Sequence, residues 1–326
     1  MRRFVVMVSL AALTAAAAAQ APEKFTFITN WYAQAEHGGF YQALATGLYQ
    51  KEGLDVSIRM GGPQVNGLQL LAAGQGDCWM GVDVQTLKAR EQGVPVVTVA
   101  AAFQKDPSVM IGHPEVVKKL EDLKGKTILL GTDSHTNYWP WLRGAYGLSD
   151  NQVRPYTFNI QPFVADKNVV QQGYLTSEPY SIEKEAKFKP TVLLLSDFGW
   201  PPYATTVVCL ERTLQQRPKA VAAFVKASME GWKNYLGGNP APANALIKKD
   251  NPAMSDELIA QATALLKSTG MVTGGDAARL GIGIVTDERM QRTYEMMVAN
   301  KLLDPAKVEL KKTYTTDFVK GLKVMP

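Results

Sequence analysis

The sequence predicts an α/β protein of two lobes that are joined by two hinge crossings and followed by C-terminal helices. Three observations predict this fold class. Short runs of β-branched and aromatic residues alternate with segments of helical periodicity, which is typical of βαβ units. Polar or proline-rich stretches interrupt the alternation near 103–106 and 203–206, where the chain would cross between the lobes. Beyond the second crossing, one helical segment follows another.

The composition is that of a globular protein with room for one large or two medium domains. The chain has 326 residues, of which 46% are hydrophobic and 20% are charged. Its formal net charge is +5, and loss of Arg2 and Arg3 with a leader peptide would leave +3. Because the lysines are scattered along the chain, this charge indicates ordinary solubility and argues against a nucleic-acid partner.

Residues 1–20 have the pattern of a secretory signal peptide. Basic residues precede the apolar stretch 4–13 and a run of alanines, with cleavage expected after Ala19 or Ala21. The apolar stretch is shorter than the roughly 20 residues that a membrane-spanning helix needs. We therefore expect an exported protein that resides in the periplasm. A short buried N-terminal helix is the alternative.

The first lobe is expected to comprise residues 21–104 and, after the return crossing, residues 204–326. The alternating stretch 25–29 predicts a strand whose carboxyl end meets a loop at Asn30. Hydrophobic residues at a spacing of four then predict a helix over about 40–48, packed on the sheet. The further strands expected in this lobe are 54–60, 77–82, 94–102 and 204–210, and the further helices are 65–73, 84–91, 218–236, 241–249, 255–267, 287–299 and one from about 315.

The second lobe is expected to comprise residues 105–203 and to repeat the alternation of strands and helices. Its expected strands are 109–112, 123–131, 153–160 and 191–195, and its expected helices are 114–121, one that ends near 146, and 164–172. Because ligands bind at the carboxyl ends of strands in open α/β sheets, the strand-end loops of both lobes should face a cleft between them.

The candidate ligand-binding residues of the first lobe follow its first strand. Loops at strand ends bind small molecules because strand ends and helix N-termini converge there. Trp31 and Tyr32 offer flat faces that stack on a planar or cationic ligand, although one of them would otherwise belong to the core. His37 is either a hydrogen-bond partner of the ligand or a strut between loops, and both interpretations stay open. Gly38 begins the next helix with bare backbone N–H groups.

The second lobe offers polar groups and one carboxylate. Thr132, Ser134 and Asn137 lie in a strand-to-helix loop that suits oxyanion or carbonyl groups. Glu178, two residues before Tyr180, follows a glycine turn. Its carboxylate either accepts hydrogen bonds from an amino-pyrimidine or amine ligand or caps the start of a helix. We include Tyr180 in the same candidate site.

Two further groups are expected near the rim of the cleft. Asp83 and Gln85 come directly after a predicted buried strand of the first lobe. The aromatic residues Tyr138, Trp139 and Trp200 would face the cleft or the hinge, and at most one of them is expected to contact the ligand. Packing within a lobe is the alternative for each.

No pattern indicates catalysis, a metal site or a cofactor. The nucleophile-elbow, dinucleotide and phosphate-loop patterns are absent from the sequence. His37, His113 and His135 lie far apart and lack the spacing of metal ligands. Cys78 and Cys209 lie in apolar strand-like runs, which favours two free buried thiols, although export would permit a disulfide.

The segment from residue 30 to residue 56 also carries a family resemblance. It has Asn-Trp at 30–31, His-Gly-Gly-Phe-Tyr at 37–41 and Gly-Leu-Tyr-Gln-Lys-Glu-Gly-Leu-Asp-Val at 47–56. This order resembles the opening of the ABC-transporter substrate-binding proteins of the thiamine-pyrimidine-precursor, nitrate, sulfonate and taurine group. The resemblance implies a type II periplasmic-binding-protein fold, a monomer that closes on a small-molecule ligand by hinge motion, and delivery to an ABC permease in the inner membrane.

The opening is most similar to that of the binders of thiamine pyrimidine precursors, so a small heteroaromatic ligand is expected. A sulfonate, nitrate or aromatic carboxylate is the alternative. An anion binder needs cationic groups or several N–H donors in its cleft, and Arg143 is the one arginine within the candidate loops.

The rival function is an enzyme, the pyrimidine phosphate synthase of thiamine biosynthesis, which resembles these binders in fold and opening. That enzyme carries a cofactor-binding lysine, a histidine and a cysteine-rich run. The lysine position falls on Gly81 here, the histidine position on Gln85, and the cysteine positions within 200–206, which holds no cysteine. Since all three elements are missing, we expect no enzymatic activity and no cofactor.

Overall fold

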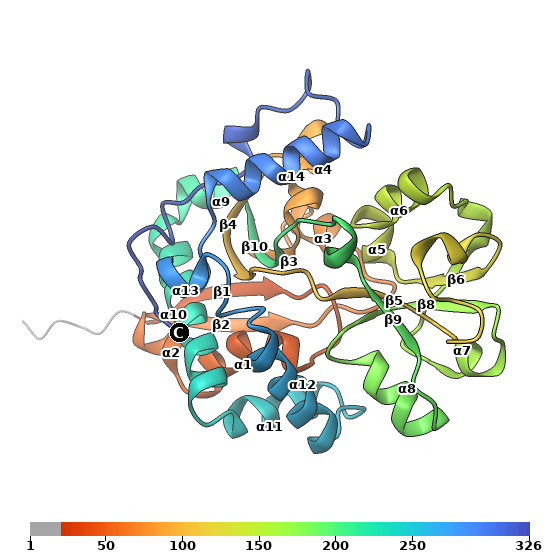
Figure 1. The fold of residues 1–326 in the computed structure, drawn as a ribbon. Helices are drawn as coiled ribbons and strands as arrows, with labels where there is room; N and C mark the ends of the chain where they lie inside the picture. The colour runs from red at the N-terminus through yellow and green to blue at the C-terminus, as the bar shows by residue number, and fades with distance from the viewer. Residues whose placement is uncertain (1–20) are drawn as a thin grey trace, which may run out of the picture.

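The computed structural model describes residues 21–326, which form two five-stranded sheets side by side (Figure 1). The first sheet has the order β2-β1-β3-β10-β4, and its strands are β1 (Glu23–Ile28), β2 (Leu54–Arg59), β3 (Cys78–Gly81), β4 (Val96–Phe103) and β10 (Ala204–Leu210). The second has the order β7-β6-β8-β5-β9, and its strands are β5 (Ser108–Gly112), β6 (Thr127–Leu130), β7 (Val153–Pro155), β8 (Val169–Tyr174) and β9 (Thr191–Leu194). The prediction of two α/β lobes is confirmed. The predicted signal peptide, residues 1–20, lies outside the described residues.

Helices cover the faces of both sheets, as the βαβ alternation predicts. The helices are α1 (Gly38–Ala45), α2 (Leu48–Lys51), α3 (Gly67–Ala72), α4 (Asp83–Glu91), α5 (Thr132–Thr136), α6 (Trp139–Tyr146), α7 (Gln161–Ala165), α8 (Glu178–Ala186), α9 (Glu211–Gln216), α10 (Pro218–Gly237), α11 (Ala241–Asp250), α12 (Asp256–Thr269), α13 (Ala277–Leu280) and α14 (Asp287–Ala299). Short 3-10 turns are η1 (Ala35–His37), η2 (Leu120–Leu123), η3 (Asp150–Gln152), η4 (Leu195–Phe198) and η5 (Leu310–Lys312). None of the helices within residues 21–326 combines the length and the hydropathy needed to span a bilayer.

The predicted return strand, β10, is the element that completes the first sheet. It lies between β3 and β4 and runs antiparallel to both, whereas β1 pairs in parallel with β2 and β3. The chain enters the second sheet through 104–107 and leaves it through the segment after η4, close to both predicted crossings. Because β10 returns from the second sheet, its antiparallel direction follows from the connection.

The hinge is tied to the C-terminal helices by one arginine. Arg289 of α14 donates hydrogen bonds from its guanidinium to the backbone carbonyls of Gln104, at 2.9 Å, and Pro201, at 3.0 Å. These two residues belong to the two crossing segments. The guanidinium also lies 4.5 Å from the ring centre of Tyr203, a cation–π contact. Both crossings are thus fixed to the same helix of the first lobe.

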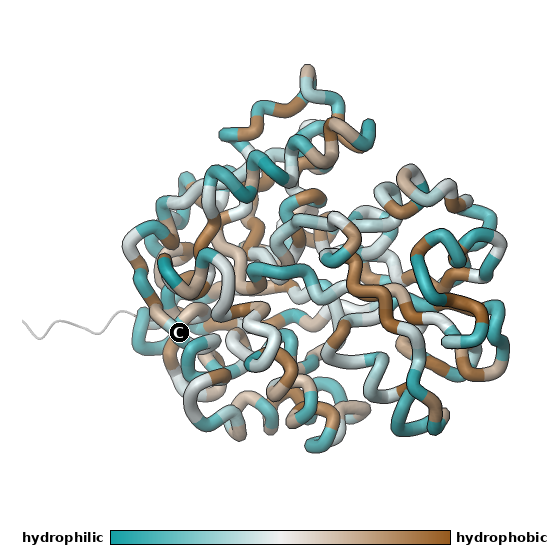
Figure 2. The backbone as a smooth tube through the Cα atoms, in the orientation of Figure 1, coloured by the Kyte–Doolittle hydropathy of each residue, from teal (hydrophilic) through white to brown (hydrophobic). Residues whose placement is uncertain are grey.

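The glycines at the start of α1 allow two helices to pack closely. A β-carbon at Gly38 would lie 2.2 Å from the Tyr235 ring, and one at Gly39 would lie 2.1 Å from the Trp232 ring of α10. A β-carbon at Gly231 would lie 2.1 Å from the carbonyl oxygen of Gly39. This close packing is part of the large hydrophobic core, and Figure 2 shows how hydrophobic and hydrophilic residues alternate along the outer helices that cover it.

Four predicted elements are wrong. The expected helix 164–172 contains the end of α7 and most of β8, because a short segment with only two pairs of apolar residues suits either structure and burial in the middle of a sheet decided. The expected helix 114–121 holds only the start of η2, and the expected strand 153–160 ends at Pro155. The expected C-terminal helix from about 315 is a series of turns. Just before it, Thr98 of β4 forms backbone hydrogen bonds to Thr313 and Thr315, which ties the chain to the sheet edge.

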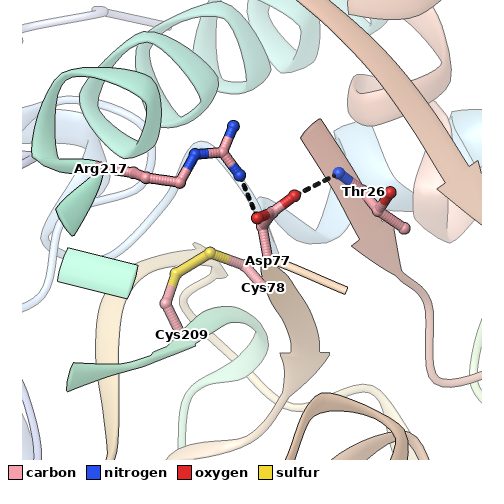
Figure 3. Close-up of a disulfide and its surroundings, with 5 residues drawn as sticks. All are labelled: Thr26, Asp77, Cys78, Cys209 and Arg217. Atoms are coloured by element: carbon pink, nitrogen blue, oxygen red, sulfur yellow. Dashed lines mark hydrogen bonds and ion pairs between the residues drawn. A yellow bond between two sulfur atoms is a disulfide. The ribbon is translucent and has the colours of Figure 1, made fainter. Parts of the chain in front are cut away.

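The preference for two free thiols is also wrong, because Cys78 and Cys209 form a disulfide (Figure 3). The register of β10 against β3 places the two residues directly opposite each other, with their Cα atoms 4.3 Å apart. Cross-strand neighbours of an antiparallel pair come this close. The two cysteines are 131 residues apart in the chain, so the contact depends on a pairing between distant strands. Beside them, Asp77 accepts hydrogen bonds from Arg217 and from the backbone of Thr26.

Candidate functional site

A cavity lies between the two lobes, where loops after β1 and β6 meet the end of β8. It contains about 510 Å³ of space between atoms, open solvent at its mouth included. The lining residues are Asn30, Trp31, Gln34, Glu36, His37, Ser108, Asp133, Ser134, Asn137, Tyr138, Gln172, Gly173, Tyr174 and Glu178.

Trp31 forms an aromatic wall of the cavity and reaches across to the second lobe. Its ring is nearly parallel to that of Tyr156, with ring centres 6.1 Å apart and planes 12° apart, and it meets Phe158 edge-on. The close approach of the Trp31 ring to the second lobe needs a glycine at position 131, because a β-carbon there would lie 2.9 Å from the indole. A hydrogen bond of 2.9 Å from the Thr29 hydroxyl to the Trp31 carbonyl holds the loop that carries the ring.

Glu178 provides a buried carboxylate at the first turn of α8. It accepts hydrogen bonds from the Tyr156 hydroxyl, at 3.1 Å, and from the backbone N–H of Tyr174, at 2.9 Å. Burial raises the pKa of this carboxyl to about 7, and the neighbouring Glu36 adds to the rise. Glu178 is an acidic residue in the first turn of α8, but its hydrogen bonds go to Tyr156 and the end of β8 and none caps the helix, so the structure favours its place in the cavity lining.

Two more carboxylates line the cavity. Glu36, in η1 of the first lobe, accepts a hydrogen bond from the hydroxyl of Thr176 in the second lobe, and burial raises its pKa. Asp133, in α5, accepts a hydrogen bond of 2.8 Å from Gln85, and burial raises its pKa to about 6. The lining residues include no lysine or arginine. The cavity therefore favours ligands that donate hydrogen bonds or carry positive charge.

Several polar atoms of the lining have no hydrogen-bond partner among the described residues. These atoms are Glu36 Oε2, His37 Nδ1, Ser108 Oγ and Asn137 Oδ1. Burial lowers the pKa of His37 to about 3, so its imidazole is neutral at neutral pH. Because a buried polar group without a partner costs free energy, such atoms are concentrated where a ligand or water completes them.

The structure brings five of the predicted site residues together at this cavity. They are Trp31, His37, Ser134, Asn137 and Glu178. Of the three aromatic residues near the hinge, Tyr138 lines the cavity. Trp139 donates to Asp150 and Trp200 donates to Asp106, both away from the lining.

Three other predicted residues lie outside the lining but join the two lobes. Gln85 donates from Nε2 to Asp133 and, at 3.0 Å, to the Thr136 hydroxyl. The backbone N–H of Thr132 donates to the Pro63 carbonyl at 2.7 Å. Tyr180 donates a hydrogen bond to Glu257 of α12. These contacts hold the lobes in a closed arrangement.

The remaining predicted residues serve the scaffold. Tyr32 packs against Phe158 of the second lobe, with ring centres 5.8 Å apart, and is not one of the lining residues. Gly38 packs under Tyr235, so its small size serves helix packing. Asp83 is buried beside the second crossing, where it accepts hydrogen bonds from the Tyr203 backbone and the Thr293 hydroxyl.

Sequence reasoning missed most of the remaining lining residues. Gln172, Gly173 and Tyr174 end β8, which the apolar pattern did not distinguish from a helix. Glu36 and Asp133 lie within loops that had been identified, and an acidic residue in a strand-end loop was a usable signal for both. The missed and the predicted residues together form the cavity.

Replacing Glu178 with glutamine is expected to change how stability depends on pH in the ligand-free protein. A carboxyl whose pKa rises from 4.5 to about 7 on folding stabilises the fold fully below pH 4.5, and this contribution is lost as the pH rises toward 7. The slope from one such group is at most about 1.4 kcal/mol per pH unit. Urea unfolding of wild type and variant at several pH values within this window measures it.

The matched control for this variant is Glu183→Gln, because Glu183 is an exposed carboxylate of the same helix. We expect the difference in stability between wild type and Glu178→Gln to depend on pH, and that for Glu183→Gln to stay constant. Equal behaviour of the two variants would contradict a buried Glu178 whose pKa is raised.

Residues 21–326, which the structure describes, contain no cluster of metal-ligating side chains, either at this cavity or elsewhere. No group of three or more histidine, cysteine, aspartate or glutamate side chains has the arrangement of a metal site there. The lining holds carboxylates, neutral hydrogen-bonding groups and aromatic rings, which suit recognition of a small organic molecule.

Comparison with known proteins gives relatives with two kinds of activity. The riboflavin-binding protein RibY of Chloroflexus aurantiacus is 29% identical over 329 residues, which cover 95% of this chain and 91% of the relative. The formylaminopyrimidine-binding protein of Halalkalibacterium halodurans is 24% identical and covers 72% of this chain and 73% of the relative. The 4-amino-5-hydroxymethyl-2-methylpyrimidine phosphate synthase THI11 of Saccharomyces cerevisiae is 22% identical, and the match covers 70% of this chain and 74% of the relative.

Among solved structures, the alkanesulfonate-binding protein SsuA of Xanthomonas axonopodis pv. citri superposes with a TM-score of 0.64. It is 14% identical, and the match covers 91% of this chain and all of SsuA. The expected fold of periplasmic substrate-binding proteins is thereby confirmed. A family model described as NMT1/THI5 like matches residues 34–243, which is more than half of the chain. The protein therefore belongs to the NMT1/THI5-like family.

Proposed function

We propose that this protein is the solute-binding component of an ABC importer and that it binds a small heteroaromatic molecule, similar to a thiamine pyrimidine precursor, in the cavity between its lobes. The lobes close on the ligand by motion about the two crossings. We place lobe 1 at residues 21–104 plus 204–326 and lobe 2 at residues 105–203. The fold and the binding proteins among the relatives support this function.

The single observation that carries the proposal is the chemistry of the cavity. It combines the Trp31 face with the buried carboxyl groups of Glu36 and Glu178 and the half-buried one of Asp133, and has no cationic side chain in its lining. An aromatic ring that carries amino or ring N–H donors fits this lining, because the rings stack and carboxylates accept the hydrogen bonds. Sulfonate, nitrate or an aromatic carboxylate would bring a further negative charge beside these carboxylates, which makes the anion alternative unfavourable.

The cavity also supports binding without turnover. Its lining contains neither a lysine for a Schiff base nor a cysteine. The pKa of His37, about 3, makes this histidine a poor general base at neutral pH. These features argue against a pyrimidine phosphate synthase. We propose further that the protein acts as a monomer in the periplasm and passes its ligand to a permease in the inner membrane.

The test is a thermal-shift screen of the purified mature protein against aminopyrimidines, flavins, sulfonates, nitrate and aromatic carboxylates. A ligand at a hundredfold excess over its Kd is expected to stabilise the protein by about 2.7 kcal/mol. We expect heteroaromatic compounds that carry amino or N–H groups to produce the shift. Stabilisation by sulfonate or nitrate alone would overturn the ligand class, and turnover of a bound pyrimidine would overturn the binding function.

A further inference from the structure

Glu36 has an unusual position among the cavity residues, because it belongs to the first lobe but bonds to the second. It lies in η1, between Trp31 and the start of α1, and is 2% exposed. Its Oε1 accepts a hydrogen bond from the hydroxyl of Thr176, which lies in the second lobe between β8 and α8. Of the other inter-lobe hydrogen bonds, the one from Gln85 ends on the lining residue Asp133, and the one from Tyr180 to Glu257 lies outside the lining.

The second oxygen of the same carboxylate is available to a ligand. Glu36 Oε2 is buried and has no hydrogen-bond partner among the described residues, and Glu36 lines the cavity. An unpaired buried carboxylate oxygen is costly, and a donor on the ligand would remove that cost. By contrast, both oxygens of Glu178 already accept hydrogen bonds from the protein.

The surroundings of Glu36 restrict the donor that it accepts. From the second lobe, Asp133, Tyr138, Tyr174 and Glu178 face the same cavity. From the first lobe, His37 lines the cavity and is neutral, and Tyr235 of α10 lies near Glu36. None of these groups supplies a cation, so the ligand has to provide the partner. The amino group of an aminopyrimidine-type ring provides an N–H donor in the plane of the ring, which suits the one free oxygen of Glu36.

We propose that Glu36 is the specificity-determining residue that selects heteroaromatic ligands with an amino group beside a ring nitrogen, and that it links their recognition to closure of the lobes. One oxygen binds the ligand donor while the other holds Thr176, so both interactions depend on the same side-chain position. This inference rests on the proposed function. It adds which group of the ligand is recognised and which residue recognises it.

The test compares two probes that differ by one group. They are 4-amino-5-hydroxymethyl-2-methylpyrimidine and the same ring with hydrogen in place of the amino group. Their Kd values are measured by calorimetry for wild type, Glu36→Gln, Thr176→Val and the control Glu183→Gln. Glutamine keeps the shape of Glu36 but replaces one acceptor oxygen with a donor, and melting curves verify that each variant folds.

We expect wild type to prefer the amino probe by about tenfold or more, as loss of a hydrogen bond to a charged group implies. Glu36→Gln should lose this preference while keeping its affinity for the probe without the amino group. Thr176→Val should raise the Kd of both probes by the same factor, because it removes only the contact between the lobes. Glu183→Gln, a change to an exposed carboxylate of α8 outside the cavity lining, should leave both Kd values and the preference unchanged.

Two results would overturn the inference and leave the proposed function intact. In the first, Glu36→Gln keeps the full preference for the amino probe. In the second, it weakens both probes equally, as a purely structural residue would. If neither probe binds to wild type, the proposed pyrimidine ligand is overturned, and this inference is overturned with it.

Discussion

Replacing Trp31 with alanine is expected to weaken ligand binding by about a hundredfold, close to 3 kcal/mol. The indole forms a wall of the cavity, and its ring also lies parallel to Tyr156 of the opposite lobe. The variant therefore loses a stacking surface for the ligand and an aromatic contact that holds the lobes closed. Calorimetry with the compound found in the thermal-shift screen measures the effect.

The neighbouring Tyr32 provides the matched control. It lies one residue further along the same loop and packs on Phe158, but it is not part of the cavity lining. Tyr32→Ala should reduce affinity much less than Trp31→Ala, and Trp31→Phe should give an intermediate value. If Trp31→Ala binds the ligand as tightly as wild type does, the cavity between the lobes is not the binding site.

Removing the disulfide is expected to lower the free energy of unfolding by about 2–5 kcal/mol. Cys78 and Cys209 are 131 residues apart, so the cross-link restricts a long loop in the unfolded chain. The double variant Cys78→Ala/Cys209→Ala should show this loss in urea unfolding. Its affinity for ligand should stay unchanged, because neither residue lines the cavity.

Chemical reduction of the wild-type protein is the control for this prediction. Reduced wild type should unfold at a lower urea concentration than oxidised wild type. The double variant should unfold at the same urea concentration with and without reductant. Counting free thiols by mass spectrometry under denaturing conditions checks the state of each sample. Two free thiols in protein purified without reductant would contradict the disulfide.

We propose that the contacts between the lobes are too weak to close them without a ligand. At the outer rim, Lys184 and Tyr180 of α8 meet Glu257 of α12, where Lys184 and Glu257 are solvent-exposed and Tyr180 is half-buried. Exposed ion pairs contribute little to stability. Inside, burial raises the pKa of Glu36 and of Glu178 in the same closed cavity. A ligand that supplies N–H donors to these carboxylates adds the differential free energy that shifts the equilibrium toward closure.

The sequence by itself determined the fold class and the place of the site. Period-two and period-four patterns depend only on near neighbours in the chain, so they identified β1, β10, α10 and most other elements. Because strand-end loops are local features too, Trp31, His37, Ser134, Asn137 and Glu178 were found without coordinates. These are the residues that the two lobes present to each other.

Only the tertiary structure decided which distant residues meet. Register between β3 and β10 made a disulfide of Cys78 and Cys209, and burial at the centre of the second sheet made a strand of 169–174. The closed lobes placed Glu36 against Thr176 and turned Gln85 into a link between lobes. Such contacts arise from packing between segments far apart in the chain, and neither periodicity nor residue type encodes which partner a buried carboxylate or cysteine will meet.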